Sequence, residues 1–327
     1  MAAAAGNDIW AVGNGDTLSF AEHWNGKVWS LVTTAHTGTG DHLNSVAVAS
    51  ASDAWAVGWS GDNNGVRPLI EHWNGTAWSV VPSPAPGSTS PFSDVILNSV
   101  AVASATDAWA VGSDFNDRTV LIEHWDGTAW SQVAAPNPST HDNELNGIAI
   151  VSATDAWAVG SAAFAAGDGF CNRALTEHWN GSQWTEVATP KVDAISCVVL
   201  HGVAASASGD VWAVGTAALQ ALTEHFDGSK WRVVPSATTG TTVLYGVTSL
   251  GTGDAWAVGD GSAASSGSTF TEQWNGGSWK AVPSPTGTGG GFLRAVTALP
   301  DSTLWTVGDQ RQPGFGGTTL VLNNAAG

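Results

Sequence analysis

Cationic residues are scarce in this chain of 327 residues. Lys+Arg 10 stand against Asp+Glu 28, which gives a formal net charge of −18. Because a strongly acidic surface repels phosphate groups, we expect no nucleic acid and no anionic membrane surface among the partners. The sequence also has no apolar run that approaches the roughly 20 residues of a membrane-spanning helix.

Cysteine is almost as scarce, since Cys171 and Cys197 are the only two. No Cys-x-x-Cys motif is present, so we do not expect redox catalysis. Few lysines and many Gly, Ser, Thr, Ala and Trp residues indicate a secreted, extracellular protein. In such a protein an even pair of cysteines predicts a disulfide.

Tryptophan, by contrast, is abundant and recurs regularly. The stretch Asp53–Gly58 (DAWAVG) returns as Asp8–Gly13, Asp107–Gly112, Asp155–Gly160, Asp210–Gly215, Asp254–Gly259 and, in weaker form, Leu304–Gly308. The Trp residues of these stretches are successively 45, 54, 48, 55, 44 and 49 residues apart. A period of this size, with several short strands in each unit, is typical of a β-propeller.

Each repeat contains four runs with the alternation and the β-branched and aromatic content of strands, here called a to d in chain order. In the second repeat, strand a is Leu43–Ala49, strand b is Asp53–Gly58, strand c is Leu69–Trp73 and strand d is Ala77–Val81. The chain holds seven a, b and c runs but only six d runs. We expect almost no helix.

These counts predict an all-β fold, a single seven-bladed β-propeller domain over residues 1–327 with four-stranded blades and an incomplete last blade. That blade should take strand c from Thr318–Asn323, with Leu322 in the place of the strand-c Trp, and lack strand d. Met1 falls inside the first strand a, so we infer that the native protein extends upstream, where any secretion signal would lie. The exposed edge of the last blade predicts a monomer or weak edge-mediated association. The blades are expected near residues 1–35, 43–84, 97–136, 145–190, 199–236, 244–285 and 293–324.

Alternation along strand b gives it one large and one small face. Asp53, Trp55 and Val57 lie on one face, whereas Ala54 and Ala56 lie on the other with Gly58. Both faces of a propeller blade are buried against neighbours. We therefore expect the Trp face of each blade to pack on the Ala face of the next.

The links between strands differ in how much they vary. The c–d link carries Asn-Gly or Asp-Gly, a strong hairpin signal, as at Asn74-Gly75. The b–c and d–a links are longer and differ in every repeat, and they emerge at the same end of an up-and-down blade. Variable loops on a rigid scaffold commonly carry function, so we expect the ligand at this b–c/d–a face. Cys171 is expected in the b–c link of the fourth repeat and Cys197 in the d–a link that leaves it.

Several polar residues are candidates at this face. The residue after the leading Leu of strand a changes around the repeats, and two interpretations stay open: a ligand-contacting ring at an axial mouth, or polar side chains that tolerate a solvated channel end. A loop tryptophan just past strand b is either a stacking surface for a sugar ring or a loop anchor on its own blade. The candidates are Asn44, Asn98, Asn146, His201, Tyr245 and Arg294 on strand a, and Trp59 with the equivalent Asp260 and Asp309 past strand b.

Acid–base and metal chemistry have weaker support. The Glu-His-Trp run of strand c, as at Glu71-His72-Trp73, occurs in five repeats, once with Phe226 in place of the Trp. Since an active site is needed once, the His is better interpreted as a partner of a turn or of the strand-b Asp. No recognised metal-ligand spacing occurs, so we expect no metal and no cofactor. Two Asp-rich loops leave calcium as a minor alternative, although they fall short of the EF-hand pattern. The histidines considered for a metal site are His36, His42, His141 and His201, with Asp41, Asp142 and Glu144 nearby, and the Asp-rich loops are 62–65 and 114–117.

The Trp-x-x-Gly of strand b and the His-Trp-Asn/Asp-Gly-x-x-Trp hairpin resemble bacterial β-propeller repeat proteins, in particular the tryptophan-rich seven-bladed lectins. The resemblance covers nearly the whole chain. It implies sugar sites in shallow pockets between neighbouring blades, although its motifs specify a blade more than a site. A weaker resemblance, to Asp-box and kelch-like propellers, carries no sialidase chemistry, because the Asp-box separates its Asp and Gly by one residue and here they are adjacent.

Three functions follow from these observations. The leading interpretation is a secreted carbohydrate-binding, lectin-like propeller. The first alternative is a polysaccharide lyase or glycoside hydrolase that uses the axial funnel, with His201, Tyr245 and Arg294 as base, acid and carboxylate clamp. The second alternative is a protein-interaction scaffold.

Overall fold

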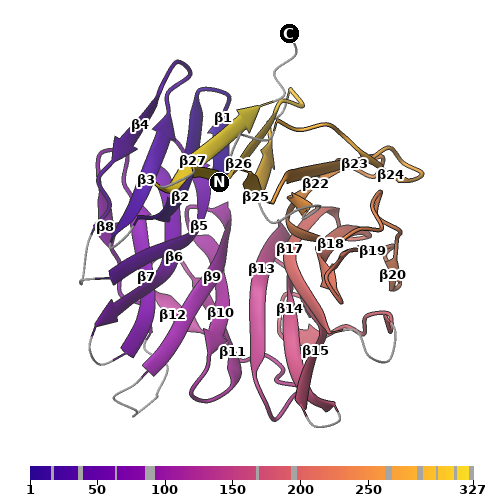
Figure 1. Cartoon of the computed structure of the whole chain (residues 1–327). Coiled ribbons are helices and arrows are strands. Elements are labelled where there is room, and N and C mark those ends of the chain that lie inside the picture. Colours follow the sequence, from indigo (N-terminus) through magenta and orange to yellow (C-terminus); the bar gives the residue numbers. More distant parts are fainter. Residues whose placement is uncertain are drawn as a thin grey trace. The chain divides into compact units, whose positions relative to one another are not determined.

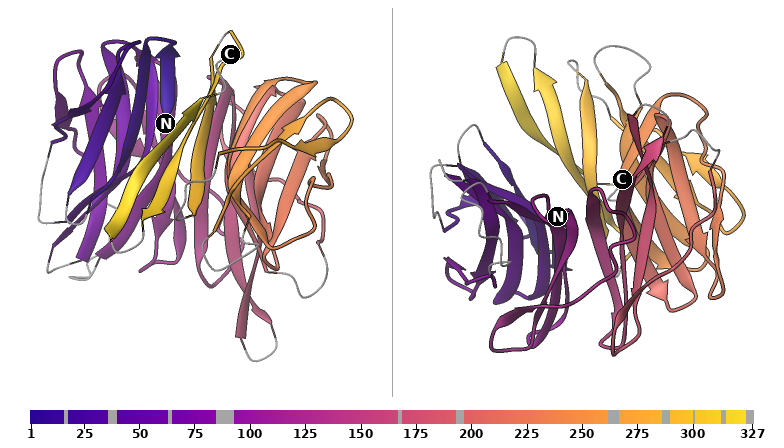
Figure 2. Two further views of the ribbon diagram at one scale, coloured as in Figure 1. Left: turned by 45° about the horizontal axis from the view of Figure 1, so that its top comes forward. Right: turned by 90° about the horizontal axis from the view of Figure 1, so that it is seen from below.

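The computed structural model consists of strands and connecting segments (Figures 1 and 2). It describes residues 1–15, 18–35, 40–62, 65–84, 93–166, 169–192, 197–261, 267–285, 290–299, 301–312 and 315–323. Within these ranges no residue is helical, as expected. Consequently none of the described segments is a long apolar helix of the kind that crosses a membrane.

The strands follow the a–b–c–d order in every repeat. The a strands are β1 (Ala2–Ala5), β5 (Gly40–Ser50), β9 (Ser93–Ser104), β13 (Asn143–Ser152), β17 (Val198–Ala207), β21 (Thr242–Gly251) and β25 (Gly291–Ala298). The b strands are β2 (Asp8–Asn14), β6 (Asp53–Asp62), β10 (Asp107–Asp114), β14 (Asp155–Ala166), β18 (Asp210–Ala217), β22 (Asp254–Gly261) and β26 (Leu304–Gln312).

The c strands are β3 (Ser19–Trp24), β7 (Gly65–Trp73), β11 (Thr119–Trp125), β15 (Gly169–Trp179), β19 (Gln220–Phe226), β23 (Thr269–Trp274) and β27 (Phe315–Asn323). The d strands are β4 (Trp29–Val32), β8 (Trp78–Val80), β12 (Trp130–Gln132), β16 (Trp184–Glu186), β20 (Trp231–Val233) and β24 (Trp279–Ala281). The prediction of six d strands is thus confirmed for the described residues.

The repeats form antiparallel sheets. Four of them are separate four-stranded sheets, as in β1-β2-β3-β4. The second and third repeats share one sheet, because Gly65 and Val66 of β7 pair in parallel with Ser93 and Asp94 of β9. The last repeat has three strands, in the order β25-β26-β27.

Contacts divide the chain into two compact units. The first is residues 1–158 with 162–164 and 177–186, and the second is residues 159–161, 165–176 and 187–327. The first three repeats therefore lie in the first unit and the last three in the second.

Our placement of Leu322 was wrong by two residues. Leu322 pairs with Thr306, and Thr306 occupies the strand-b place of Ala257, which pairs with Glu272 in the sixth repeat. Leu322 therefore stands where the other c strands carry Glu. The weak sequence match of the last repeat left this register undetermined.

The complementary faces pack as expected. In the first unit, Trp10 contacts a buried cluster that includes Ala54 and Ala56 of the next repeat. In the second unit, Trp212 contacts Ala255 and Ala257 in the same way. These Trp side chains are almost completely buried, and a fully buried large side chain contributes roughly 3 kcal/mol by transfer from water.

A second layer of ring contacts covers each of these Trp residues. The ring of Trp55 lies 4.4 Å from His72 of its own repeat, 4.8 Å from Trp125 and 5.1 Å from Trp130 of the next, the last in an edge-on arrangement. Edge-on and tilted aromatic pairs are the favoured geometries. The strand-c and strand-d Trp residues thus cover the strand-b Trp of the preceding repeat.

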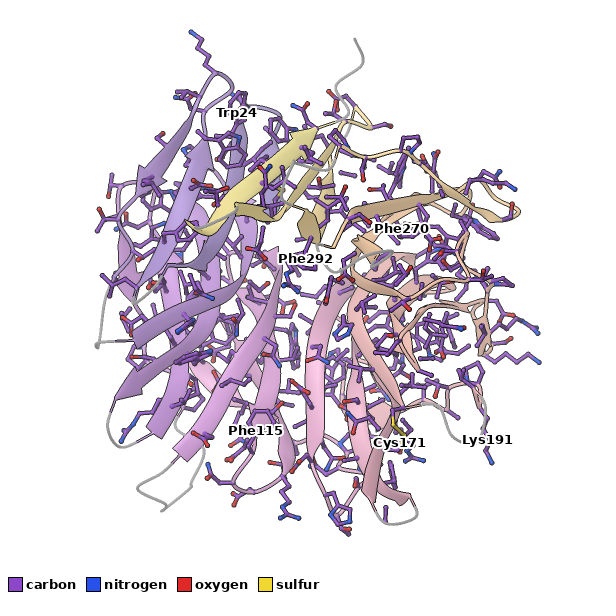
Figure 3. The ribbon with its side chains drawn as sticks, in the orientation of Figure 1. Trp24, Phe115, Cys171, Lys191, Phe270 and Phe292 are labelled. Atoms are coloured by element: carbon purple, nitrogen blue, oxygen red, sulfur yellow. A yellow bond between two sulfur atoms is a disulfide. The ribbon has the colours of Figure 1, made fainter. Side chains whose placement is uncertain are left out.

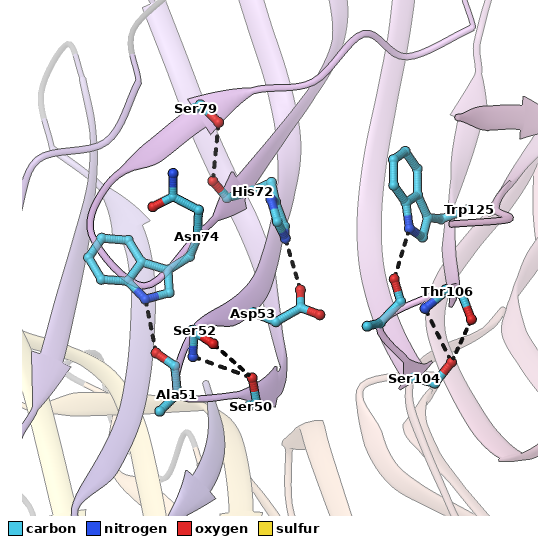
Figure 4. Close-up of polar contacts among 12 residues, drawn as sticks. Ser50, Ala51, Ser52, Asp53, His72, Asn74, Ser79, Ser104, Thr106 and Trp125 are labelled. Carbon is cyan, nitrogen blue, oxygen red and sulfur yellow. Dashed lines mark hydrogen bonds and ion pairs between the residues drawn. The ribbon is translucent and has the colours of Figure 1, made fainter. Parts of the chain in front are cut away.

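The repeated histidine is structural. His72 Nε2 lies 2.8 Å from Asp53 Oδ1, and four other repeats have the same pair at 2.7–2.9 Å. In the sixth repeat Gln273 replaces the His and donates to Asp254 at 3.0 Å. Figure 4 shows this pair beside the bond from the indole N–H of Trp125 to the Ala105 carbonyl and its equivalent at Ala51. The interpretation of the His as the partner of the strand-b Asp is confirmed.

Candidate ligand-binding site on the bulged inner strands

Five of the six candidate residues of strand a occupy β-bulges. In β5 the pairing to β6 passes from Leu43–Gly58 directly to Ser45–Val57, so Asn44 is the extra residue. The same shift leaves out Asn98 in β9, His201 in β17, Tyr245 in β21 and Arg294 in β25. A bulge re-aims one side chain and bends its strand. The sequence did not predict these bulges.

The bulge also explains the last residue of the DAWAVG motif. A Cβ added to Gly58 would lie 1.9 Å from the His42 carbonyl oxygen, and one added to Gly215 would lie 2.0 Å from that of Val199. The bulged strand therefore approaches strand b so closely that only glycine fits there. The Gly of the motif is the sequence signal that could have revealed the bulge.

In the first unit this position has a structural role. Asn44 donates from its side-chain amide to the Leu97 carbonyl at 2.9 Å, and Asn98 donates to the Leu145 carbonyl at 2.9 Å. Each amide thus joins strand a of one repeat to strand a of the next. This bridging role, rather than contact with a ligand, accounts for Asn44 and Asn98. Asn146 accepts a longer bond from the Asn98 amide, at 3.4 Å.

In the second unit the same position carries three different side chains that contact one another. The rings of His201 and Tyr245 lie 5.4 Å apart between centroids. The guanidinium carbon of Arg294 lies 4.6 Å from the centroid of Tyr245 and 5.5 Å from that of Phe292. Phe292 is labelled in Figure 3. A guanidinium this close to a ring face gains cation–π energy.

A carboxylate completes the cluster. Arg294 Nε donates to Asp309 Oδ2 at 3.1 Å, and both side chains are about half exposed, at 48% and 57%. Asp309 and Asp260 lie on strand b and pair with Phe292 and Val243 of strand a. The structure therefore places Asp309, a separate candidate from the sequence, beside His201, Tyr245 and Arg294, which the enzymatic alternative had already grouped. Asp260 acts on Tyr245 through its charge.

Burial and neighbouring charge set the protonation of this cluster. Burial, together with the nearby Arg294 charge, lowers the pKa of His201 to about 4. Burial also raises the pKa of Tyr245, with a smaller contribution from Asp260. Both groups are consequently neutral at pH 7, so the cluster offers a neutral imidazole and a phenol hydroxyl beside a charged guanidinium–carboxylate pair.

Trp59 is not a loop residue. It lies in β6 and pairs with Pro68 of β7, because the b–c hairpin of the second repeat is extended well beyond the predicted strands. Its ring stacks on His42 of β5 at 3.8 Å between centroids and 17° between planes. The interpretation of Trp59 as an anchor on its own blade therefore gains support over the sugar-stacking one.

No metal centre emerges among the residues that the structure describes, where no group of three His, Cys, Asp or Glu side chains could hold an ion. The Asp-rich loop at Asp114 has another explanation, because Asp114 Oδ1 accepts the backbone N–H groups of Asn116 and Asp117 and closes a turn. His36 and residues 63–64 of the 62–65 loop lie outside the described residues.

The predicted disulfide joins Cys171 and Cys197, whose Cα atoms lie 4.9 Å apart (Figure 3). Cys171 lies in strand β15, however, and not in a loop, since the hairpin of β14 and β15 is longer than the repeat pattern predicts. The bond ties this hairpin to the segment that precedes β17.

The deep burial of the strand-c glutamates was not predicted from the sequence. Five of them are fully buried: Glu71, Glu123, Glu177, Glu224 and Glu272. Three accept hydrogen bonds from the preceding d–a link, as Glu123 does from the Ser83 hydroxyl at 2.7 Å. Burial raises the pKa of Glu71 and Glu123 to about 7 and that of Glu177 and Glu224 to about 8. Three of the five carboxyl groups thus join a d–a link to strand c, whereas both carboxyl oxygens of Glu177 and of Glu224 have no hydrogen-bond partner among the described residues.

Solved structures share this architecture. YCF48 bound to a D1 peptide is 14% identical, with 94% of this chain and 87% of that chain covered and a TM-score of 0.59. YCF48 from Cyanidioschyzon merolae is 13% identical, with 91% and 96% covered and a TM-score of 0.55. The GH74 xyloglucanase from Xanthomonas campestris is 12% identical, with 92% and 53% covered and a TM-score of 0.56.

The chain has a β-propeller fold. Its seven a–b–c–d repeats are the blades, and the last has one strand fewer among the described residues, as the repeats predicted. No protein-family model matches the sequence, and no curated protein matches it either. Because the solved structures are so distant in sequence, their likeness shows the fold alone.

Proposed function

We propose that this propeller is a secreted carbohydrate-binding protein, and that its ligand contacts Tyr245, Arg294 and Asp309, with His201 beside them. The observation that carries the proposal is the change at the bulge position. In the first unit it holds Asn44 and Asn98, which bridge strands, whereas in the second it holds an aromatic and cationic cluster whose Arg294–Asp309 pair is half exposed.

The chemistry of this cluster suits a sugar. The faces of Tyr245 and Phe292 can stack on the C–H side of a pyranose ring. The guanidinium of Arg294 presents several donors in a fixed plane and Asp309 presents acceptors, so the pair matches adjacent hydroxyl groups. A neutral His201 adds one donor or acceptor without adding charge. The disulfide agrees with an extracellular protein, and we propose that no metal or cofactor takes part.

Glycan-array binding followed by titration calorimetry tests the proposal. We expect Arg294→Ala and Tyr245→Ala each to weaken binding at least ten-fold. Asn44→Ala, at the same bulge position in the first unit, is the matched control and should bind as the wild type does. Binding that survives both substitutions in folded protein would remove the site, and the absence of any glycan ligand would remove the function. Addition of EDTA should leave the affinity unchanged.

An enzymatic function is the second candidate, favoured by the neutral His201 next to Tyr245 and Arg294, which could serve as base, acid and carboxylate clamp. A GH74 xyloglucanase shares the fold. Release of reducing ends or unsaturated products from polysaccharides would establish it, and His201→Ala should then abolish turnover while binding persists.

A protein-interaction scaffold is the third candidate, since a YCF48 structure of the same fold is bound to a peptide. Binding of peptides with a free carboxylate that depends on Arg294, without binding of any glycan, would favour it.

A further inference from the structure

The residue that follows the bulge of strand a faces the next strand a. In the second unit this residue is Gly202 in β17 and Gly246 in β21, each in the pairing directly after the bulge. A Cβ added to Gly202 would lie 2.8 Å from the Tyr245 carbonyl oxygen, and one added to Gly246 would lie 3.0 Å from the Cα of Ala295. Both contacts are with backbone atoms, which cannot turn aside. Strands β17, β21 and β25 therefore approach so closely that a side chain at either place must push them apart.

The first unit accommodates a side chain at this place. Ser45 directly follows the bulge of β5, and its hydroxyl oxygen accepts the Val100 N–H of β9 at 3.3 Å. A serine side chain thus stands between these two strands, where the second unit has only the hydrogens of glycine. The bulge residue before it, Asn44, bonds to a backbone carbonyl of the next strand and not to another side chain.

The bulge residues of the second unit lie at the points of closest approach. Gly202 directly follows His201, and the backbone atom that its Cβ would strike belongs to Tyr245. Gly246 directly follows Tyr245, and its Cβ would lie 3.1 Å from the Arg294 carbonyl oxygen. The side chains meet at these same points, with 5.4 Å between the rings of His201 and Tyr245 and 4.6 Å from the guanidinium carbon of Arg294 to the Tyr245 ring. Close backbone approach and side-chain contact thus coincide.

We propose that Gly202 and Gly246 are positioning residues of the ligand site. Because they have no side chains, three a strands can approach, and this approach holds Tyr245 against His201 on one strand and Arg294 on the other. The three groups then form one surface for a single sugar instead of three separate contacts. This role rests on the proposed function, but the arrangement itself can be measured without a ligand.

Serine, the residue of the first unit, tests each glycine in the variants Gly202→Ser and Gly246→Ser. The first measurement is the titration of the His201 imidazole by NMR. Burial and the Arg294 charge lower the pKa of His201 to about 4. Separation of the strands exposes the ring and moves Arg294 away from it, so we expect the pKa of His201 to rise by roughly one unit or more toward its usual value. The matched control is Ser45→Gly, the reverse exchange in the first unit, which should leave this pKa unchanged.

The second measurement is the affinity for a glycan that binds the wild type, by titration calorimetry. Both glycine variants should bind about ten-fold more weakly or worse, because the order of the site before binding is lost. Ser45→Gly should bind as the wild type does. An unchanged titration of His201 in both variants, or full glycan affinity despite a shifted titration, would overturn the proposal. The absence of any glycan ligand for the wild type would instead remove the proposed function, and the titration would still decide whether the two glycines hold the cluster together.

A measurement on the wild type covers the case in which neither glycine variant folds. The hydrogen of Gly246 that occupies the place of a Cβ points at the backbone of Ala295. We therefore expect a nuclear Overhauser effect between the α-protons of Gly246 and Ala295. Its absence would show that β21 and β25 stand apart and would overturn the proposal.

Discussion

Asn98 donates its side-chain amide to the carbonyl oxygen of Leu145 at 2.9 Å, and so ties strand β9 to strand β13. The donor sits on a bulge, where the chain turns its side chain toward the neighbouring strand instead of along its own sheet. The same place in the second unit holds His201, Tyr245 and Arg294. The same bulge therefore carries a bridging amide in the first unit and the side chains of the proposed ligand site in the second.

Removal of this bond should lower stability without affecting the ligand. Asn98→Ala leaves a partly buried carbonyl without its donor, so we expect the free energy of unfolding to fall by about 1–2 kcal/mol. Urea titration followed by tryptophan fluorescence measures the loss. Arg294→Ala, at the equivalent bulge but more exposed, should cost less than about 0.5 kcal/mol. Equal losses in the two variants would contradict a bridging role for Asn98.

The strand-b Trp residues are covered to different extents by the next blade, so replacement of Trp by Ala should lower the free energy of unfolding by different amounts at two of these positions. Trp55 is 1% exposed and contacts two Trp rings of the next blade, so Trp55→Ala should destabilise by about 3–5 kcal/mol. Trp256 borders a cavity and is partly exposed, so Trp256→Ala should cost roughly half as much. Chemical denaturation of both variants decides this, and a larger loss at Trp256 would be inconsistent with the incomplete cover.

The blades and the packing of Trp on Ala could be predicted from the sequence, because both depend on short-range alternation repeated in every unit. Features that depend on the pairing register of the strands could not be predicted. Leu322 was placed in the wrong register because no Trp marks strand c in the last repeat. The bulges were missed because their one sequence signal is the glycine at the end of strand b, such as Gly58, where a Cβ would clash with the bulged strand. Tyr245 and Arg294 were grouped with His201 from the sequence, and Asp309 was a separate candidate past strand b, but the contacts of Arg294 with Tyr245 and with Asp309 needed the three-dimensional structure.

Buried Glu177 should make stability depend on pH. Its carboxyl oxygens have no hydrogen-bond partner among the described residues, because Ala135 stands where the second repeat has Ser83 and the following Pro136 has no N–H. Burial, with a smaller effect of Glu186, raises its pKa from 4.5 to about 8. The folded form therefore keeps a proton that the unfolded chain loses above pH 4.5.

This contribution to stability is complete below pH 4.5 and is lost progressively as the pH rises through 8. Glu177→Gln removes the titration, so we expect it to stabilise the protein at pH 8.5 and to have little effect at pH 4.5. Melting temperatures at the two pH values provide the measurement. The matched control is Glu123→Gln, which should gain less because Ser83 already bonds that carboxyl group. A stabilisation that is independent of pH would rule out this explanation.

The disulfide should contribute measurably to stability. Cys171 and Cys197 are 26 residues apart, and closure of a loop of this length in the unfolded chain corresponds to about 3 kcal/mol. We expect the double variant Cys171→Ala/Cys197→Ala to unfold at lower urea concentration by this amount. Thiol labelling of the unreduced wild type should detect no free cysteine. Two reactive thiols in native protein would show that the bond does not form.

The glycine that ends the DAWAVG motif should be the least replaceable residue of the blade. In Gly58→Ala the new Cβ would lie 1.9 Å from the His42 carbonyl oxygen and 2.9 Å from the Cα of Leu43, both backbone atoms that cannot turn aside. Strand β5 must then move away from β6 or lose its bulge, which we expect to cost about 3 kcal/mol or more.

The control is Gly253→Ala, because a Cβ there has no heavy atom within 4 Å, so its effect should stay within about 0.5 kcal/mol. Denaturant titration compares the two variants. Since the same clash recurs at Gly112, Gly215, Gly259 and Gly308, tolerance of alanine at Gly58 would mean that the bulge is not what requires glycine in this motif.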